Sequence, residues 1–305
     1  MQALLERILR EAEPATRGGQ CADYIPALAS VHPGLIGLAL VDEKGEVFAA
    51  GHSARQFTIQ SVSKILALAY VLETKGEEAV FSRVGMEPTG DPFNSIIRLE
   101  TSSIRKPFNP LINAGAIAVT ALLPGGNAVE RVEKLLEFVG ILAGREGIRV
   151  DEIVYVSERD TAARNRAIGW FLKELGLIEG AVDEALDAYF RQCAILLNAV
   201  DLARIGAVLA FDGIEPKSGK RCISARTSHI VKSLMMTCGL YDGSGEFGVE
   251  AGIPAKSGVG GGILAAAKRR CGIGTFGPAL DKRGNSAAGI MMIKRLSAEL
   301  DLFAL

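Results

Sequence analysis

Groups of apolar residues near the two ends of the chain predict the strands of one sheet. Residues 35–51 (LIGLALVDEKGEVFAAG) hold two apolar runs on either side of an Asp-Glu-Lys-Gly turn, which is typical of a β-hairpin. Towards the other end, the segments KSGVGGGILAAA, CGIGTFGP and NSAAGIMMI follow one another at short spacing. They have strand character and precede a final helix that we predict from about Ile293.

The middle of the chain has helical character instead. After a short extended segment at 57–60, residues 61–80 are rich in Leu and Ala and predict a helix. Helical spacing of apolar positions also predicts helices at 128–139, 161–175, 182–197 and 201–210, with glycine stops at Gly140, Gly176 and Gly213.

This order of elements predicts an α/β (mixed α+β) fold. A central antiparallel sheet, built from both ends of the chain and flanked by helices, stands beside an all-helical subdomain. We expect residues 1–70 and 216–305 to form the discontinuous sheet domain and residues 71–215 to form the helical subdomain.

Composition removes several classes of function. The chain has 305 residues, of which 49% are hydrophobic, and its 34 basic and 35 acidic residues give a net charge of −1. A nucleic-acid binder normally shows a basic excess, so this balance argues against nucleic acid as a partner. Three scattered histidines make a histidine-based metal site improbable on composition alone, and five cysteines without a C-x-x-C pair indicate reduced thiols. We expect no bound metal.

The chain also carries no sign of a membrane segment. No run approaches the roughly 18 apolar residues that a membrane span requires. The first residues, MQALLERILREAEPA, place charges among the leucines and predict an amphipathic surface helix rather than a signal peptide. We therefore expect a cytoplasmic protein.

The first candidate for chemistry is the S-x-x-K sequence from Ser61 to Lys64, at the predicted start of a helix. Positions i and i+3 share a helical face, so the lysine amine reaches the serine hydroxyl, and a desolvated lysine is a base that can activate a serine. The alternative is an ordinary helix start with a solvated lysine. A second S-x-x-K, Ser103 to Lys106, lies before Pro107 in a polar stretch and predicts a loop.

The second candidate is Lys256-Ser257-Gly258. In serine acyl-transferases of the penicillin-recognising type, a K-[ST]-G triplet on a strand lines the site opposite the nucleophile. The glycines that follow allow backbone N–H groups to approach a ligand. Another copy at residues 217–219 lies between Pro216 and Lys220 and predicts a turn.

Six longer segments carry a family resemblance. In order they are IQSVSK, NPLINAGAI, SERDTAARNRAIGW, YFRQCAILLN, MMTCGLYDGSGEFG and IPAKSGVGGGI, and the chain resembles the serine-dependent glutaminases from about Tyr24 to Gly289. The resemblance implies a β-lactamase/transpeptidase-like fold and hydrolysis of the side-chain amide of L-glutamine without cofactor or metal. It also implies a homo-oligomer, a dimer or a tetramer.

The resemblance also implies roles for single residues. Ser61 is the implied nucleophile, Lys64 its base, and Tyr241 a proton relay. Backbone N–H groups of Ser61 and Val259 form the implied oxyanion hole. The residues implied to line the site or to hold the amino-acid end of glutamine are Tyr24, Asn113, Glu158, Asn165, Tyr189 and Tyr241.

The residue types agree with such a substrate. Glutamine presents an ammonium and a carboxylate, so Glu158 suits the ammonium, and Asn113 with tyrosine hydroxyls suits the carboxylate. Glu158 and Asn165 are seven apart, two turns on one face if the helix is continuous. The alternatives are a first-turn acid favoured by the helix dipole for Glu158 and a solvated amide for Asn165. A buried amide in a turn or cap is the alternative for Asn113, and ordinary half-buried tyrosines are the alternative for Tyr189 and Tyr241. For Tyr24, before Ile25-Pro26, the alternative is a contact that fastens the first helix.

Two other functions fit the same sequence. One is a penicillin-interactive hydrolase or esterase of the same fold, and the other is a non-catalytic glutamine sensor on a degenerate enzyme scaffold. An ammonium-binding acid such as Glu158 favours an amino-acid substrate over a β-lactam. The presence of both Ser61 and Lys64 argues against degeneration. A second amine, Lys256, would help to hold Lys64 neutral if the fold brings the two together.

Overall fold

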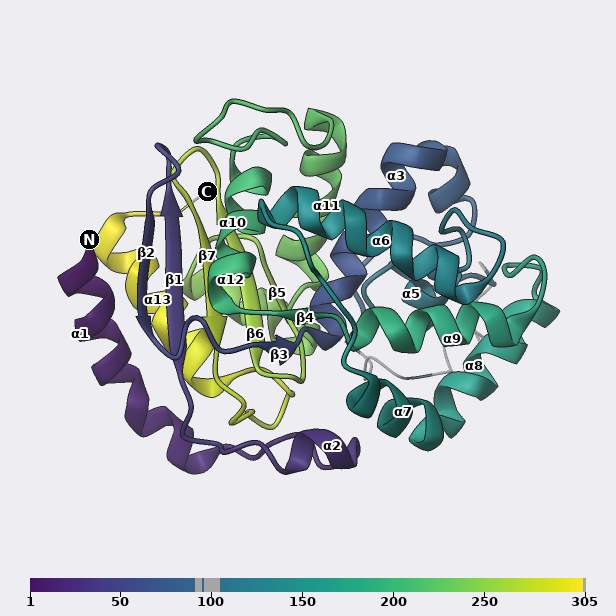
Figure 1. Cartoon of the computed structure of the whole chain (residues 1–305), viewed down its shortest axis with the longest axis horizontal. Coiled ribbons are helices and arrows are strands. Elements are labelled where there is room, and N and C mark those ends of the chain that lie inside the picture. Colours follow the sequence, from purple (N-terminus) through teal and green to yellow (C-terminus); the bar gives the residue numbers. More distant parts are fainter. Residues whose placement is uncertain (91–94, 96–104, 304–305) are drawn as a thin grey trace.

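A five-stranded antiparallel sheet in the order β2-β1-β7-β6-β5 forms the centre of the sheet region in the computed structural model, which describes residues 1–90, 95 and 105–303 (Figure 1). Its strands are β1 (Gly37–Asp42), β2 (Val47–Gly51), β5 (Ala255–Ser257), β6 (Gly262–Ala267) and β7 (Cys271–Phe276). β1 pairs with β7, so that Leu40 lies opposite Ile273. The two ends of the chain therefore share one sheet, and the predicted antiparallel sheet is confirmed.

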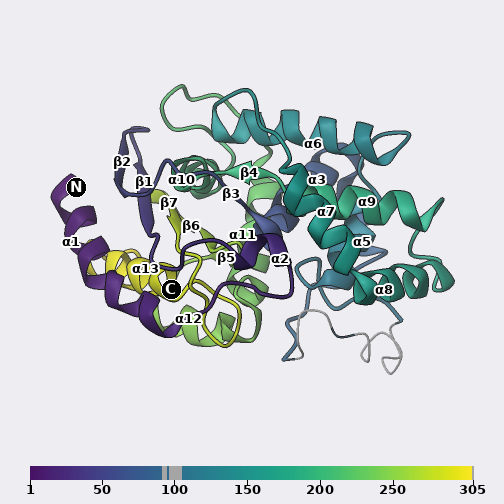
Figure 2. The ribbon, with the colours of Figure 1, turned by 60° about the horizontal axis from the view of Figure 1, so that its bottom comes forward.

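Helices cover both faces of this sheet (Figure 2). The helix α10 (Ala199–Ala210) packs on one face against β1, β6 and β7, and α1 (Gln2–Ala12) and α13 (Ala287–Leu300) cover the other. Glycine makes the α10 contact possible. A Cβ on Gly272 would lie 2.0 Å from the backbone nitrogen of Ala207, and a Cβ on Gly274 would lie 2.0 Å from the carbonyl oxygen of Ala199. The helix backbone therefore rests directly on β7.

A second group of helices packs together beside the sheet region (Figure 1). Its members are α3 (Ser63–Phe81), α5 (Asn113–Thr120), α6 (Ala128–Ala143), α7 (Glu152–Thr161), α8 (Ala163–Glu174) and α9 (Val182–Cys193). The division at residues 71–215 stays a prediction, and the contacts place α10, which falls inside that range, on the sheet.

The remaining described elements are shorter or lie around these two regions. They are α2 (Pro26–Ala29), α11 (Ala225–Cys238), α12 (Ser244–Glu250), the short strands β3 (Phe57–Thr58) and β4 (Leu196–Leu197), and the 3-10 turns η1 (Glu13–Gly18), η2 (Gln60–Val62) and η3 (Tyr241–Gly243). β3 and β4 pair antiparallel as a separate two-stranded sheet. This small sheet ties the segment before Ser61 to the segment after α9.

Several predicted helix boundaries were wrong. The helix α6 continues through Gly140 and ends before Gly144, whose φ of +66° is the left-handed value that suits glycine at a helix end. The final helix begins at Ala287 rather than near Ile293, so the segment NSAAGIMMI, predicted as a strand, forms the start of α13 instead. The hydroxyl of Ser286 accepts from the backbone N–H of Gly289 and caps this helix. The helix predicted over 182–197 ends at Cys193, and 196–197 form β4.

The second copies of the two short motifs have different outcomes. Residues 217–219 form the predicted turn, in which Glu215 accepts from the backbone N–H groups of Lys217 and Ser218. The second S-x-x-K begins at Ser103, which lies outside the described residues.

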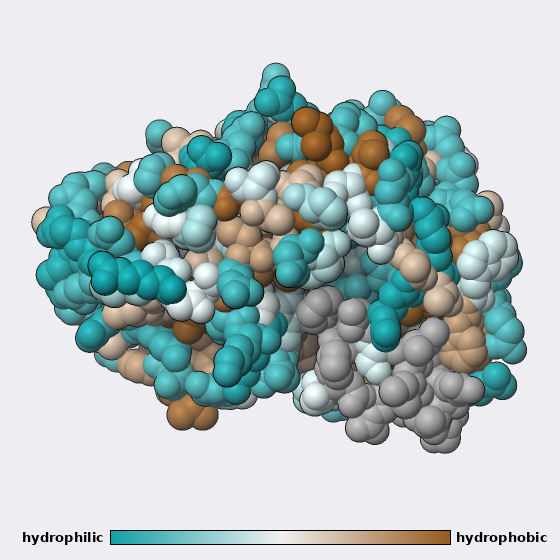
Figure 3. Space-filling view, turned by 90° about the horizontal axis from the view of Figure 1, so that it is seen from below, coloured by the Kyte–Doolittle hydropathy of each residue, from teal (hydrophilic) through white to brown (hydrophobic). Residues whose placement is uncertain are grey.

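On the face drawn in Figure 3, the described residues form no single large hydrophobic patch. Hydrophilic side chains dominate there, and hydrophobic residues form separate small groups. Throughout residues 1–90, 95 and 105–303, none of the helices has the length and apolar character needed to cross a membrane.

Candidate active site

Ser61 lies where the two regions meet. It occupies η2, directly before α3, and Lys64 follows in the first turn of that helix. Both side chains are buried. Gln60, next to Ser61, has a φ of +47°, which is uncommon for a residue with a side chain. Unfavourable backbone of this kind clusters at functional sites, where the surrounding structure enforces it.

The Lys-Ser-Gly strand runs beside Ser61. A Cβ on Gly258 would lie 2.3 Å from the carbonyl oxygen of Ile59 and 3.2 Å from the backbone nitrogen of Ser61. A Cβ on Gly260 would lie 2.0 Å from the carbonyl oxygen of Thr58. The glycine-rich turn after β5 therefore packs backbone to backbone against the residues before the candidate nucleophile. Val259 lies between these two glycines and is itself buried.

Lys64 is fully enclosed. Its Nζ donates to the carbonyl oxygen of Leu111 at 3.2 Å and to Oδ1 of Asn113 at 2.7 Å. Burial lowers the pKa of Lys64 to about 8, although the nearby acidic groups, Cys193 and Glu158, favour its charged form. A substantial fraction of this amine is therefore neutral close to physiological pH.

Lys256 is a second buried amine near the first. Its Nζ donates to the carbonyl oxygens of Gly239 at 2.9 Å and Ser257 at 2.6 Å, and it lies 4.6 Å from the centre of the Tyr241 ring. Burial, and then the positive charge of Lys64, lower the pKa of Lys256 well below its usual range. Burial is the largest cause of the lowered pKa of Lys64. Repulsion between the two amines acts on both, and the expectation that Lys256 helps to hold Lys64 neutral stays a prediction.

Tyr241 approaches Ser61 from the sheet region. It opens η3 with a φ of +56°, a second non-glycine residue in the left-handed region. Burial raises the pKa of Tyr241 to about 12, and the nearby Ser61 and Ser257 hydroxyls oppose that rise. The phenol therefore keeps its proton at neutral pH.

A cavity of about 240 Å³ opens beside Ser61. Seven residues named from the sequence line it: Tyr24, Ser61, Asn113, Glu158, Asn165, Tyr189 and Val259. Tyr24 is half exposed and stands at the rim. Tyr241 does not line this cavity. It lies near the Ser61 hydroxyl and borders a smaller hollow with Leu111 and Cys238. The cavity suits a small ligand.

Glu158 provides the acidic group of the cavity. Burial raises its pKa to about 7, while hydrogen bonding from Gln60, the positive charge of Lys64 and hydrogen bonding from Cys193 oppose the rise. Within the part of the chain that the structure describes, its buried Oε2 has no hydrogen-bond partner. A buried carboxylate oxygen without a donor is unusual, and a ligand with a positive donor would satisfy it.

The two asparagines meet each other in this cavity. Nδ2 of Asn113, the first residue of α5, donates to Oδ1 of Asn165 at 3.0 Å. Glu158 and Asn165 do not share one helix, because α7 ends at Thr161 and Ala162, with ψ of +34°, separates it from α8. The condition of a continuous helix is therefore not met, and the two residues reach the cavity from two helices.

The cavity includes residues that the sequence reasoning did not select. These are Ile25, Gln60, Thr161, Ala162, Arg164 and Cys193. The buried thiol of Cys193 opposes the rise in the pKa of Glu158 and raises the pKa of Tyr189. Their position in the sequence could have indicated two of these additional residues. Gln60 and Cys193 lie inside two of the segments that carry the family resemblance, IQSVSK and YFRQCAILLN.

The antiparallel sheet, the adjoining helices and the buried serine and lysine between them define an enzyme with a β-lactamase-like fold. Comparison with known proteins narrows this class. A model of the glutaminase family matches residues 19–304. Glutaminase 2 of Clostridium perfringens (strain 13 / Type A) is 49% identical over 302 residues, which cover 99% of each chain. The chain belongs to the glutaminase family.

Solved structures of glutaminases are also similar to this chain. That of a probable glutaminase, ybaS, is 41% identical, has a TM-score of 0.92 and covers 99% of this chain and 98% of its own. The Bacillus subtilis glutaminase YbgJ, in a covalent complex with 5-oxo-L-norleucine formed by reaction with 6-diazo-5-oxo-L-norleucine, is 36% identical. Its TM-score is 0.91, and the match covers 100% of this chain and 99% of that one.

Proposed function

We propose that the protein hydrolyses the side-chain amide of L-glutamine to L-glutamate and ammonia through an acyl-enzyme on Ser61. The observation that carries this proposal is the content of one cavity: a buried serine and Glu158, whose carboxylate has an unsatisfied oxygen. An amide substrate with a charged ammonium group matches both of these groups.

The covalent complex of the Bacillus subtilis relative supports the acyl-enzyme. 5-Oxo-L-norleucine carries the amino and carboxyl groups of an amino acid and an oxo group at C5, the position of the amide carbonyl in glutamine. A family member thus forms a covalent bond with a compound of the shape of glutamine. We extend this reactivity to Ser61 of the present chain.

The proposed first step transfers the proton of Ser61 to neutral Lys64 while the serine oxygen attacks the amide carbon. The backbone N–H groups of Ser61 and Val259 would stabilise the oxyanion, each by roughly 3 kcal/mol. Tyr241, protonated at neutral pH, would donate to the leaving nitrogen, which departs as ammonia. Water would then attack the ester carbonyl and give a proton to the Tyr241 phenolate. The ester bond would break as Lys64 returns the first proton to the Ser61 oxygen, and glutamate would leave.

Recognition would come from the helical side of the cavity. Glu158 would pair with the ammonium group, and Asn113, Asn165 and Tyr189 would bind the carboxylate. An ammonium held by Glu158 fixes how far the amide carbon reaches towards Ser61. Asparagine is one methylene shorter, so we expect roughly 10- to 200-fold weaker kcat/KM on it.

A coupled ammonia assay tests this function. Wild-type protein should release ammonia from glutamine, the Ser61→Ala variant should release none, and nitrocefin should not be hydrolysed. Ser82→Ala, at the opposite end of α3, is the matched control and should retain full turnover. Near-normal turnover by the Ser61→Ala variant would contradict the serine mechanism. Glutamine binding without ammonia from wild-type protein would instead favour the sensor, and nitrocefin hydrolysis the penicillin-interactive alternative.

The family resemblance further leads us to propose a homo-oligomer, a dimer or a tetramer, located in the cytoplasm. Sedimentation of the purified protein tests the first point.

A further inference from the structure

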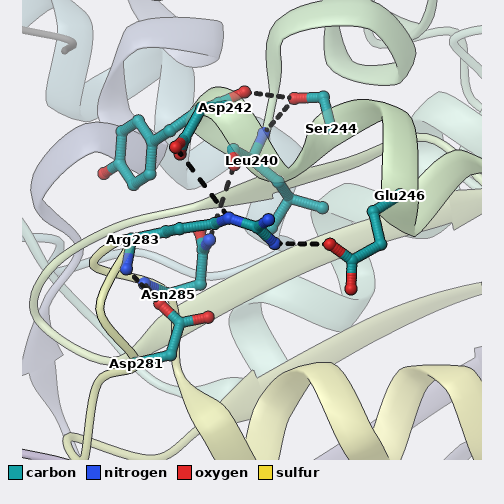
Figure 4. Close-up of polar contacts among 8 residues, drawn as sticks. Leu240, Asp242, Ser244, Glu246, Asp281, Arg283 and Asn285 are labelled. Atoms are coloured by element: carbon teal, nitrogen blue, oxygen red, sulfur yellow. Dashed lines mark hydrogen bonds and ion pairs between the residues drawn. The ribbon is translucent and has the colours of Figure 1, made fainter. Parts of the chain in front are cut away.

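A single buried side chain connects the backbone segments that carry the proposed acid and the proposed oxyanion hole. Asn285 is buried and lies in the loop between β7 and α13. Its Oδ1 accepts from the hydroxyl of Ser257, on β5, at 2.6 Å. Its Nδ2 donates to the carbonyl oxygen of Leu240 at 3.4 Å (Figure 4). Because Leu240 directly precedes Tyr241 and Ser257 stands two residues before Val259, this one amide ties the two segments together.

The chemistry of these partners fixes the orientation of the Asn285 amide. A carbonyl oxygen only accepts hydrogen bonds, so the amide nitrogen faces Leu240 and the amide oxygen faces Ser257. An inverted amide would place two acceptors against each other at Leu240. Both contacts therefore depend on the amide, and a side chain without an amide loses the connection.

The loop that carries Asn285 is closed on itself. Leu280 and Ser286 form an antiparallel bridge across its base. Inside the loop, Oδ1 of Asp281 accepts from the backbone N–H groups of Arg283 at 2.8 Å and Asn285 at 3.0 Å (Figure 4). The backbone N–H of Asp281 donates in turn to the carbonyl oxygen of Asn285 at 2.8 Å. These bonds hold Asn285 in place within the loop.

The same loop packs close to Tyr241 and Val259. At Gly284, which has a φ of +87°, a Cβ would lie 3.7 Å from Cγ1 of Val259 and 3.8 Å from Cε2 of Tyr241. An exposed ion pair adds a further connection, in which Nη1 of Arg283 reaches Oε2 of Glu246 on α12 at 2.6 Å (Figure 4). The loop therefore contacts the proposed acid and also the helix that follows η3.

The two connected segments differ in how firmly they are held. β5 pairs with β6 in the central sheet. η3 is a short 3-10 turn outside that sheet, and it begins at Tyr241 with a left-handed φ of +56°. Within the turn, the Ser244 hydroxyl donates to the carbonyl oxygen of Tyr241 and accepts from the backbone N–H of Leu240, both at 2.9 Å (Figure 4). An unfavourable backbone conformation of this kind persists only where its surroundings enforce it.

We propose that Asn285 is a positioning residue for Tyr241: it transfers the fixed position of β5 to the η3 turn and so places the phenol within reach of the leaving nitrogen. This inference rests on the proposed function of Tyr241 as the acid. Loss of the Asn285 amide should let η3 relax while Ser61 and Lys64, on the opposite side of the reacting bond, keep their places.

Two substrates that differ only in the leaving group measure this effect. The nitrogen of glutamine leaves only after it has accepted a proton, whereas the methoxide of L-glutamate γ-methyl ester leaves with much less help from an acid. Both substrates form the same acyl-enzyme, and both develop an oxyanion in the same hole. The ratio of their kcat/KM values, glutamine over ester, therefore reports the acid, and it does not depend on the fraction of folded protein.

The ratio should fall in a graded series of variants. Tyr241→Phe removes the acid and should lower the ratio roughly 100-fold. Asn285→Ala only displaces the acid and should lower it roughly tenfold. Ser257→Ala breaks the shorter of the two contacts and should also lower the ratio, which keeps the test available if Asn285→Ala does not fold. Added to Tyr241→Phe, Asn285→Ala should cause no further fall, because the two changes act on the same step.

The matched control is Asn127→Ala, which removes a capping asparagine from α6 and should keep the wild-type ratio. A wild-type ratio in both Asn285→Ala and Ser257→Ala overturns the inference, as does a further fall when Asn285→Ala is added to Tyr241→Phe. If wild-type protein released no ammonia from glutamine, the proposed function itself would fail, and this inference with it.

Discussion

The two walls of the cavity are built in different ways. On the sheet side, Ser61 and Val259 are positioned by backbone segments that touch where glycines leave no room for a side chain. On the helical side, Glu158 and Asn165 reach the cavity as side chains from two separate helices. The proposed oxyanion hole at Ser61 and Val259 is thus positioned by backbone contacts, whereas the groups proposed for recognition are side chains. Changes in the first wall should affect kcat, and changes in the second should affect KM.

The largest effect is expected from Gly258→Ala. The new Cβ would lie 2.3 Å from the carbonyl oxygen of Ile59 and would push the glycine-rich turn away from Ser61. Displacement of about 1 Å costs on the order of 100-fold in kcat. Steady-state kinetics together with thermal unfolding measure it.

Gly248→Ala is the matched control for that change. No atom lies within 4 Å of a Cβ at this position on α12, so kcat should stay at the wild-type value. If Gly258→Ala also turned over normally, the close backbone contact would not be what positions the oxyanion hole.

Glu158→Gln should weaken recognition instead. The variant keeps the shape of the side chain but loses the charge that we assign to the substrate ammonium. A hydrogen bond to a charged group contributes about 1.5–3 kcal/mol, so kcat/KM should fall roughly 10- to 150-fold, mostly through KM. Glu152→Gln, an exposed acid on the same helix, should leave KM unchanged. A fall in kcat alone would place Glu158 among the chemical groups.

The pH dependence of kcat/KM should reflect the titration of one group on each wall of the cavity. Lys64, with a pKa of about 8, must lose its proton to act as base, and Glu158, with a pKa of about 7, must be ionised to bind the ammonium. Both requirements fail as the pH falls. The logarithm of kcat/KM should therefore decrease with a slope near one between pH 8 and 7 and near two below pH 7.

The Glu158→Gln variant sharpens this test. Without the carboxyl group, the slope below pH 7 should stay near one. A retained slope of two would assign the lower titration to another group.

The same contrast explains what the sequence could predict. The sheet wall follows from short-range patterns: the S-x-x-K helix start, the Lys-Ser-Gly strand and the glycines after it were all visible in order. The helical wall depends on contacts between distant segments. The break at Ala162 has no glycine or proline to announce it, and the hydrogen bond from Asn113 to Asn165 joins residues 52 apart.

Buried contacts between distant segments account for the other differences between the sequence predictions and the structure. The sequence placed Lys64 within reach of Ser61, but the partners that receive its hydrogen bonds, Leu111 and Asn113, come from the start of α5 and the residues just before it. Similarly, Gly140 predicted a helix end, yet α6 passes through it. A Cβ there would lie 2.8 Å from the carbonyl oxygen of Arg145, so packing against the returning chain requires a glycine within the helix. Tertiary contact decides such positions, and local propensity does not.

The smallest effect is expected from removing the N-terminal cap of α7. This change tests whether the position of Glu158 depends on how its helix begins. Asp151 caps α7, and its carboxylate accepts from the backbone N–H groups of Ile153 and Val154, both at 3.0 Å. Asp151→Ala should cost about 1 kcal/mol of unfolding free energy, as should Asn127→Ala at the start of α6. Of these two helices, only α7 carries Glu158, which lines the cavity. Only Asp151→Ala should therefore raise KM, by roughly twofold to threefold if about half of the lost free energy reaches the Glu158 carboxylate. Denaturant unfolding and KM measured on both variants separate these effects. An equal KM for the two would mean that Glu158 is held by its contacts within the cavity and not by the start of its helix.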